Sequence, residues 1–173
     1  MIPLTPTDVR PALQAKLAEV TSCVRGLRDV EQPRLTPRMH GWEIVAKLMA
    51  TARAIYQMAE TFVESRPGTD FDTWYAAWLA SLTELQRELW QQMRDAGGEQ
   101  LHGECAELFA VKVTIPWEPA AETFHGVPGV ARPESYKPVP RFRRYPGRPA
   151  SDVCADYCAL CQRFVDEIRR LRN

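Results

Sequence analysis

Long apolar runs are missing from this sequence. No run approaches the ~18–20 residues that a membrane-spanning helix needs. The first 14 residues also lack a basic segment followed by an apolar stretch, so they do not have the pattern of a secretory signal. These absences predict a protein of the cytoplasm that has no membrane partner.

An excess of charge of one sign is missing as well. The 173 residues include 22 basic and 22 acidic side chains, so the chain as a whole is attracted neither to polyanions nor to polycations. Apolar residues make up 45% of the chain and charged residues 25%, which is typical of a globular protein. This composition excludes a wholly disordered chain, a collagen and a disulfide-dense scaffold. The length favours a single domain over residues 1–173.

Histidine is scarce, with three residues in the whole chain. Glu99 and His102, and likewise Glu122 and His125, have the Glu-x-x-His spacing that places two metal ligands on one helix face in di-metal carboxylate bundles. His125, however, lies among glycines and a proline that are typical of a turn. A matched pair of helical motifs is therefore absent, and we do not predict a di-metal site.

The cysteines are a second, weak candidate for a metal site. Cys154, Cys158 and Cys161 share one face of a predicted helix, but the outer two are about 10.5 Å apart along its axis, too far for one zinc ion with bonds of about 2.3 Å. At most one neighbouring pair, Cys154 with Cys158 or Cys158 with Cys161, could share a metal with His102 or Cys105. The favoured interpretation is that they are reduced thiols that pack as small apolar side chains, without a cofactor. His102 and Cys105 also have a spacing that suits a thiol nucleophile and its base, although no known signature surrounds them.

Helical periodicity, by contrast, is abundant. Apolar residues recur at spacings of three and four, as they do from Val9 to Leu27. The predicted helices cover residues 7–28, 36–65, 69–95, 99–113 and 151–172. Short connections between most of them favour an all-α fold, an antiparallel bundle of four to five helices. One alternative stays open: residues 111–115 are rich in β-branched side chains and could form a short strand.

Local signals refine these helices at two points. Thr69 with Asp70 is the predicted cap of the helix over 69–95, and Ser151 with Asp152 is the predicted cap of the last helix. Trp74 and Trp78 lie on the apolar stripe of the helix over 69–95, so we expect both in the core.

Residues 114–150 form a predicted irregular arm before the last helix. They contain eight of the 14 prolines, and a connection of this length is usually functional or disordered. Its aromatic residues argue against disorder, so we expect an ordered arm lying across the helices. Up to Val130 the chain has 12 basic and 17 acidic residues, and after it 10 and 5, so the second half of the arm is basic. The predicted interaction residues are these arm side chains and one tryptophan outside the helical stripe: Trp90, Trp117, Tyr136, Arg141, Phe142, Arg143, Arg144, Tyr145 and Arg148.

Three hypotheses for the function follow. The first is a non-enzymatic helical module that binds protein, as a subunit of a homo- or hetero-oligomeric assembly that uses the arm for docking. The second is a subunit that binds single-stranded RNA or DNA, because arginines interleaved with aromatic rings suit phosphates and stacked bases. The third is a small metal-dependent or thiol-dependent enzyme built on a helical bundle.

Overall fold

The computed structural model describes residues 9–32, 41–99, 108–115 and 135–171 of the chain. This part of the protein is mostly helical, as predicted, and also contains a two-stranded sheet. In chain order the elements are α1 (Arg10–Glu31), α2 (Gly41–Glu64), α3 (Phe71–Ala80), α4 (Glu84–Glu99), β1 (Leu108–Ile115), β2 (Ser135–Phe142) and α5 (Ala150–Arg170).

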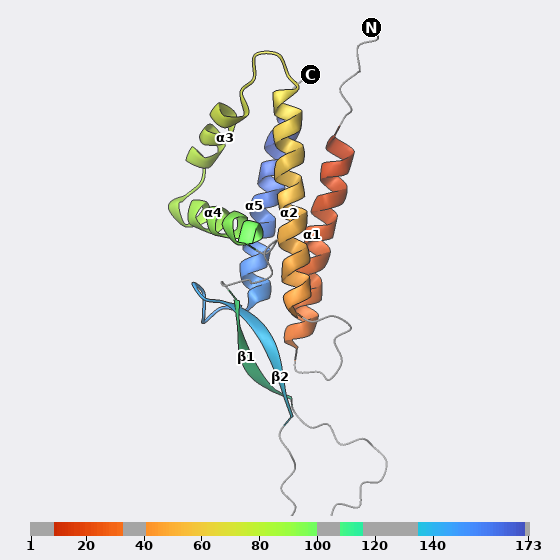
Figure 1. The fold of residues 1–173 in the computed structure, drawn as a ribbon, viewed down its shortest axis with the longest axis vertical. Coiled ribbons are helices and arrows are strands. Elements are labelled where there is room, and N and C mark those ends of the chain that lie inside the picture. Colours follow the sequence, from red (N-terminus) through yellow and green to blue (C-terminus); the bar gives the residue numbers. More distant parts are fainter. Residues whose placement is uncertain (1–8, 33–40, 100–107, 116–134, 172–173) are drawn as a thin grey trace, which may run out of the picture.

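The three long helices α1, α2 and α5 pack together and hold most of the core (Figure 1). α1 runs in the opposite direction to α2 and α5, which run the same way (Figure 1). The stripe predicted for the first helix is buried from Leu13 to Leu27, because a spacing of three and four keeps these side chains on one face. α5 is apolar over a wide arc because α1, α2 and α4 all pack against it.

The single helix predicted over residues 69–95 is wrong, because the chain breaks into α3 and α4. Asp70 begins α3 as predicted: its carboxylate accepts the backbone N–H of Thr73 at 2.8 Å. Near residues 81–83 the chain turns, and Thr83 and Gln86 then form a reciprocal capping box at the start of α4. The side chain of each accepts a hydrogen bond from the backbone N–H of the other, so a new helix starts where the periodicity had suggested continuation.

The helix predicted over 99–113 and the wholly irregular arm over 114–150 are also wrong. Residues 108–115 form β1 and residues 135–142 form β2, which pair as an antiparallel ladder from Leu108 opposite Phe142 to Ile115 opposite Ser135. The alternative strand over 111–115 is therefore confirmed as part of β1. Residues 100–107 and 116–134 of the predicted helix and arm lie outside the described residues.

The hairpin formed by β1 and β2 contacts the helices through β2, which packs against α2 and α5. Its two prolines, Pro138 and Pro140, are two residues apart, so their nitrogens face the same edge of the strand. Proline has no N–H, and it is therefore tolerated on a strand edge that makes no ladder hydrogen bonds. At the first residue of α2 the approach is very close. A Cβ added to Gly41 would lie 2.6 Å from Cδ of Pro140, so glycine is needed for β2 to reach this position.

Candidate functional site

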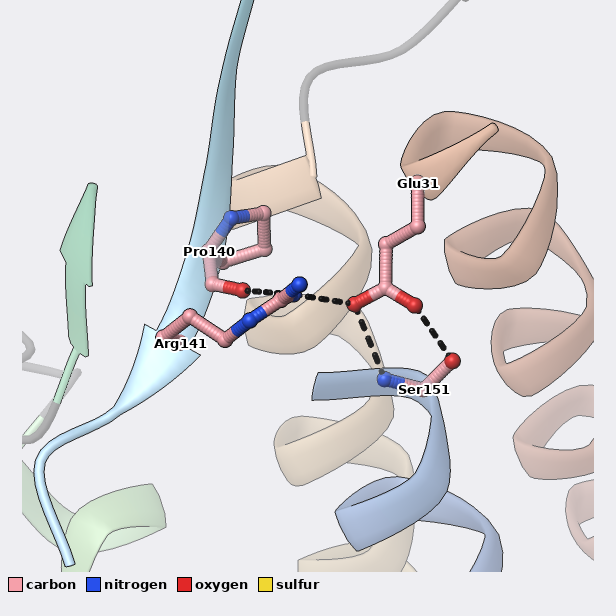
Figure 2. Close-up of polar contacts among 4 residues, drawn as sticks. All are labelled: Glu31, Pro140, Arg141 and Ser151. Atoms are coloured by element: carbon pink, nitrogen blue, oxygen red, sulfur yellow. Dashed lines mark hydrogen bonds and ion pairs between the residues drawn. The ribbon is translucent and has the colours of Figure 1, made fainter. Parts of the chain in front are cut away.

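The described part of the predicted arm contacts the helices at several points, and the less exposed of its two ion pairs with them is the one with Glu31. This residue ends α1, and its side chain is 11% exposed. Figure 2 shows Arg141 of β2 and Ser151 of α5 converging on it. Arg141 Nη1 donates to Glu31 Oε1 at 2.8 Å, and the Ser151 N–H donates to the same oxygen at 3.3 Å. The Ser151 hydroxyl donates to the other carboxylate oxygen, Oε2.

This arrangement replaces the predicted cap of the last helix. Pro149 is the N-cap of α5 and makes no side-chain cap bond, whereas Ser151 lies inside the first turn. The first N–H groups of a helix have no partner within it, and the positive end of the helix dipole favours a negative charge. Glu31 supplies both the acceptor and the charge from α1, so it caps α5 from another helix.

Two of the predicted interaction residues are committed to the protein's own fold. The Arg141 side chain is 17% exposed and also donates to the Pro140 carbonyl at 3.1 Å, so its guanidinium is occupied by Glu31 and by its own strand. Phe142 has no exposed surface and belongs to the hydrophobic core. Its predicted role as an exposed interaction residue is wrong, because its ring fills the space between the hairpin and the helices.

Trp90 is likewise wrongly predicted as a surface residue. It is 1% exposed, its ring centroid lies 4.6 Å from that of Trp78, and its indole N–H donates to the Tyr75 hydroxyl at 2.7 Å. The break between α3 and α4 shifts the phase of the apolar stripe, which turns Trp90 inward and leaves Leu85 exposed. Trp78 lies in the core as predicted, with Phe164 of α5 packed edge-on against it.

The other predicted arm residues lie after β2, with two exceptions. Arg143, Arg144 and Arg148 are exposed, and Tyr145 is half-buried against the core. Burial raises the pKa of the Tyr145 hydroxyl. Of the exceptions, Tyr136 lies in β2 opposite Thr114, and Trp117 lies outside the described residues.

A groove of about 410 Å³ brings two of these arm residues, Tyr145 and Arg148, next to α4 and α5. We call it the Leu85 groove, after a large apolar side chain in its lining that is 77% exposed. Its other lining residues include Leu89, Tyr145, Arg148, Asp156, Leu160 and Arg163. Arg148 pairs with Asp156 at 2.8 Å and Arg163 donates to Gln86 at 3.1 Å, so the rim is polar while the centre is apolar. Sequence reasoning missed this groove, because it treated residues 69–95 as one continuous helix and did not predict the break that leaves Leu85 exposed.

The cysteines of α5 do not form a ligand row. Cys154 and Cys161 have no exposed surface, and Cys158 lies 3.6 Å from the Thr21 hydroxyl of α1. The four described cysteines are free thiols, and no group of three potential metal ligands occurs within the described residues. Burial raises the pKa of both Cys154 and Cys161, so these thiols stay protonated and poorly nucleophilic. His102 and Cys105 lie outside the described residues.

Comparison with known proteins adds no relative to this description. The chain matches no protein-family model, no curated protein and no solved structure. Among the helices of the described residues, none combines the length and the apolar character that crossing a bilayer requires.

Proposed function

We propose that the chain is a non-enzymatic protein-interaction module, a subunit of a homo- or hetero-oligomeric assembly, that docks through the Leu85 groove. The observation that carries this proposal is the 77% exposure of Leu85 beside a groove that also contains Tyr145 and arginines. Tyrosine and arginine around an apolar centre are typical of the residues that dominate binding energy at protein interfaces. The buried, protonated thiols of α5 support a non-enzymatic role for that helix.

A second copy of the chain is the partner that the groove fits best. Its surroundings carry both signs of charge, with Arg148 and Arg163 close to Asp156. A twofold axis brings the same surface of two subunits together, so a patch with both signs can pair arginine with carboxylate across the interface. Leu85 of each copy would then be buried in the centre.

The nucleic-acid alternative receives less support from the same residues. It needs exposed rings between the arginines, whereas Phe142 is fully buried and Arg141 is paired with Glu31. Arg143, Arg144 and Arg148 are exposed, but of the predicted neighbouring rings whose side chains the structure describes, only the half-buried Tyr145 is left near them.

Light scattering of the purified chain over a wide concentration range tests the proposal. We expect a dimer whose dissociation constant rises at least tenfold in Leu85→Glu, because an apolar side chain buried at an interface contributes about 1.5–3 kcal/mol. Thr61→Glu, an equally acidic change at an exposed site on α2, is the matched control and should leave the mass unchanged. A chain that is monomeric throughout, or a Leu85→Glu variant as dimeric as the wild type, would contradict docking of a second copy here. Nucleic acid that copurifies and is released by salt would favour the alternative instead.

A further inference from the structure

A second cavity, larger than the Leu85 groove, opens between α2 and α4. Its volume is about 640 Å³, within the range of about 300–1,000 Å³ typical of small-molecule sites. It shares no described lining residue with the Leu85 groove, so it is a separate feature of the surface. We call it the Tyr56 cleft, after the ring that α2 contributes to its wall.

The floor of the Tyr56 cleft is apolar. Met49 and Ala52 of α2 and Met93 of α4 are buried there, together with the rings of Trp90 and Tyr157. Methionine side chains are flexible and polarizable and adapt to differently shaped apolar groups. Such a floor suits an apolar or aromatic body rather than a strongly hydrated one.

Arg94 stands at the rim in a fixed orientation. Its guanidinium carbon lies 5.7 Å from the ring centroid of Tyr56 and 5.8 Å from that of Tyr75. Its Nη1 donates to the Tyr75 hydroxyl at 3.2 Å, and that hydroxyl also accepts the indole N–H of Trp90. The contacts to Tyr56 and Tyr75 preorganise the guanidinium, and the bond from Trp90 holds the Tyr75 hydroxyl in place. This order lowers the entropy lost when Arg94 binds a ligand.

Arg94 retains capacity to bind an anion. The side chain is 42% exposed, and its described carboxylate partner is Asp95, with Nε to Oδ1 at a long 3.8 Å. A guanidinium has five N–H donors, and the bond to Tyr75 uses one of them. Arg53 adds a second cation to the same rim.

The charges around the cleft narrow the class of ligand. The faces of Tyr56 and Tyr75 are already covered by a guanidinium, which argues against a cationic ligand that would need those faces. Glu60 and Asp95 balance the two arginines, so a dianion such as a phosphate ester would meet repulsion as well as attraction. A ligand with a single carboxylate and an apolar body can pair its charge with the arginines at the rim and place its body on the apolar floor.

We propose that the Tyr56 cleft binds a small monocarboxylate with an apolar, ring-sized body, whose carboxylate pairs with Arg94 and Arg53 while the body lies on Met49, Met93 and Trp90. The pairing with Arg94 is the stronger of the two, because that guanidinium is held in place by Tyr75. Trp90 makes binding observable, since its indole lines the cleft.

Titration calorimetry with 2-naphthoate, using 2-naphthamide as a neutral control of the same shape, tests this site. We expect saturable binding of the acid, at least tenfold weaker binding of the amide, and a change of tryptophan fluorescence with the acid. Arg94→Gln should weaken binding of the acid about 10- to 100-fold, because hydrogen bonds to charged groups are worth about twice as much as neutral ones. Arg53→Gln should weaken it less, and Arg25→Gln, at an exposed arginine on α1, should leave it unchanged.

Several outcomes would overturn the proposal. They are the absence of saturable binding, equal binding of acid and amide, and unchanged affinity in both Arg94→Gln and Arg53→Gln. Circular dichroism of each variant shows whether it is folded, and Arg53→Gln, which removes no described contact, keeps the test decisive if Arg94→Gln loses structure. Leu85→Glu should bind 2-naphthoate as the wild type does, so failure of the docking proposal and failure of this one are distinguishable.

Discussion

Glu31 joins three elements of the fold through one carboxylate. It ends α1, pairs with Arg141 of β2 and accepts two hydrogen bonds from Ser151 in the first turn of α5 (Figure 2). Because the pair is mostly shielded from water, its attraction is screened less than that of a surface ion pair. Loss of the carboxylate charge would leave the Arg141 guanidinium partly buried without a counter-charge.

Glu31→Gln is therefore expected to lower the free energy of unfolding by about 2–3 kcal/mol, below the cost of breaking a fully buried pair because some water reaches both groups. Urea titration followed by circular dichroism measures this change. The matched control is Glu19→Gln on the same helix, whose exposed pair with Lys16 at 3.0 Å should contribute less than about 0.5 kcal/mol. Equal losses in the two variants would show that Glu31 behaves as an ordinary surface carboxylate.

At the residue scale, the sequence predicted that the arm contacts the helices, but it did not predict which residues make the contact. An ordered arm lying across the helices was expected, and the ion pair of Arg141 with Glu31 is one contact of that kind. Nothing local indicated Glu31, because it and Arg141 are 110 positions apart. The Tyr56 cleft was missed for the same reason: its walls come from helices whose packing has no signature in local periodicity.

At the scale of elements, periodicity located the long helices because their burial is one-sided. α1, α2 and α5 keep their apolar residues at spacings of three and four over their whole length. The same criterion failed between α3 and α4, where the spacing continues across the break by coincidence. Thr83 and Gln86 had the Thr-x-x-Gln spacing of a capping box, and that signal could have placed the boundary.

Thr83→Ala should lower the free energy of unfolding by about 1 kcal/mol, because the N–H of Gln86 loses its cap. Thermal unfolding followed by circular dichroism checks this value. Thr61→Ala makes the same chemical change inside α2, where the hydroxyl bonds back to the Gln57 carbonyl, and should be neutral or slightly stabilising. A Thr83→Ala variant as stable as Thr61→Ala would mean that the break between α3 and α4 does not depend on the cap.

The hairpin was the element hardest to predict. Pro138 and Pro140 argue against a strand in a segment whose sequence would otherwise predict one. Its partner strand β1 is also distant in the sequence, because residues 116–134 separate the two strands. Pairing over such a separation depends on tertiary contacts, here the approach of Pro140 to Gly41. The β-branched residues of 111–115 identified one strand, whereas nothing local identified its partner.

At the scale of the whole molecule, the hairpin completes the core. Val139 and Phe142 of β2 have no exposed surface, and Phe142 belongs to the same buried cluster as the apolar faces of α1, α2 and α5. The predicted arm therefore has two parts with different roles. Its strand is part of the fold, while Tyr145 and Arg148 after it line the Leu85 groove, where we propose docking.

Phe142→Ala tests whether the hairpin and the helices share one hydrophobic core. Removal of a fully buried phenylalanine should lower the free energy of unfolding by about 3–5 kcal/mol, since the lost burial adds to the cost of the cavity left behind. Far-ultraviolet circular dichroism and tryptophan fluorescence, recorded in one urea titration, should show the same shift of the midpoint, because the hairpin and the helices share the core and unfold together. Arg144→Ala, two residues further on at an exposed position, should shift neither probe. A midpoint that stays in place for the helical signal would instead show that the helices hold together without the hairpin, and that Phe142 stabilises only its own strand.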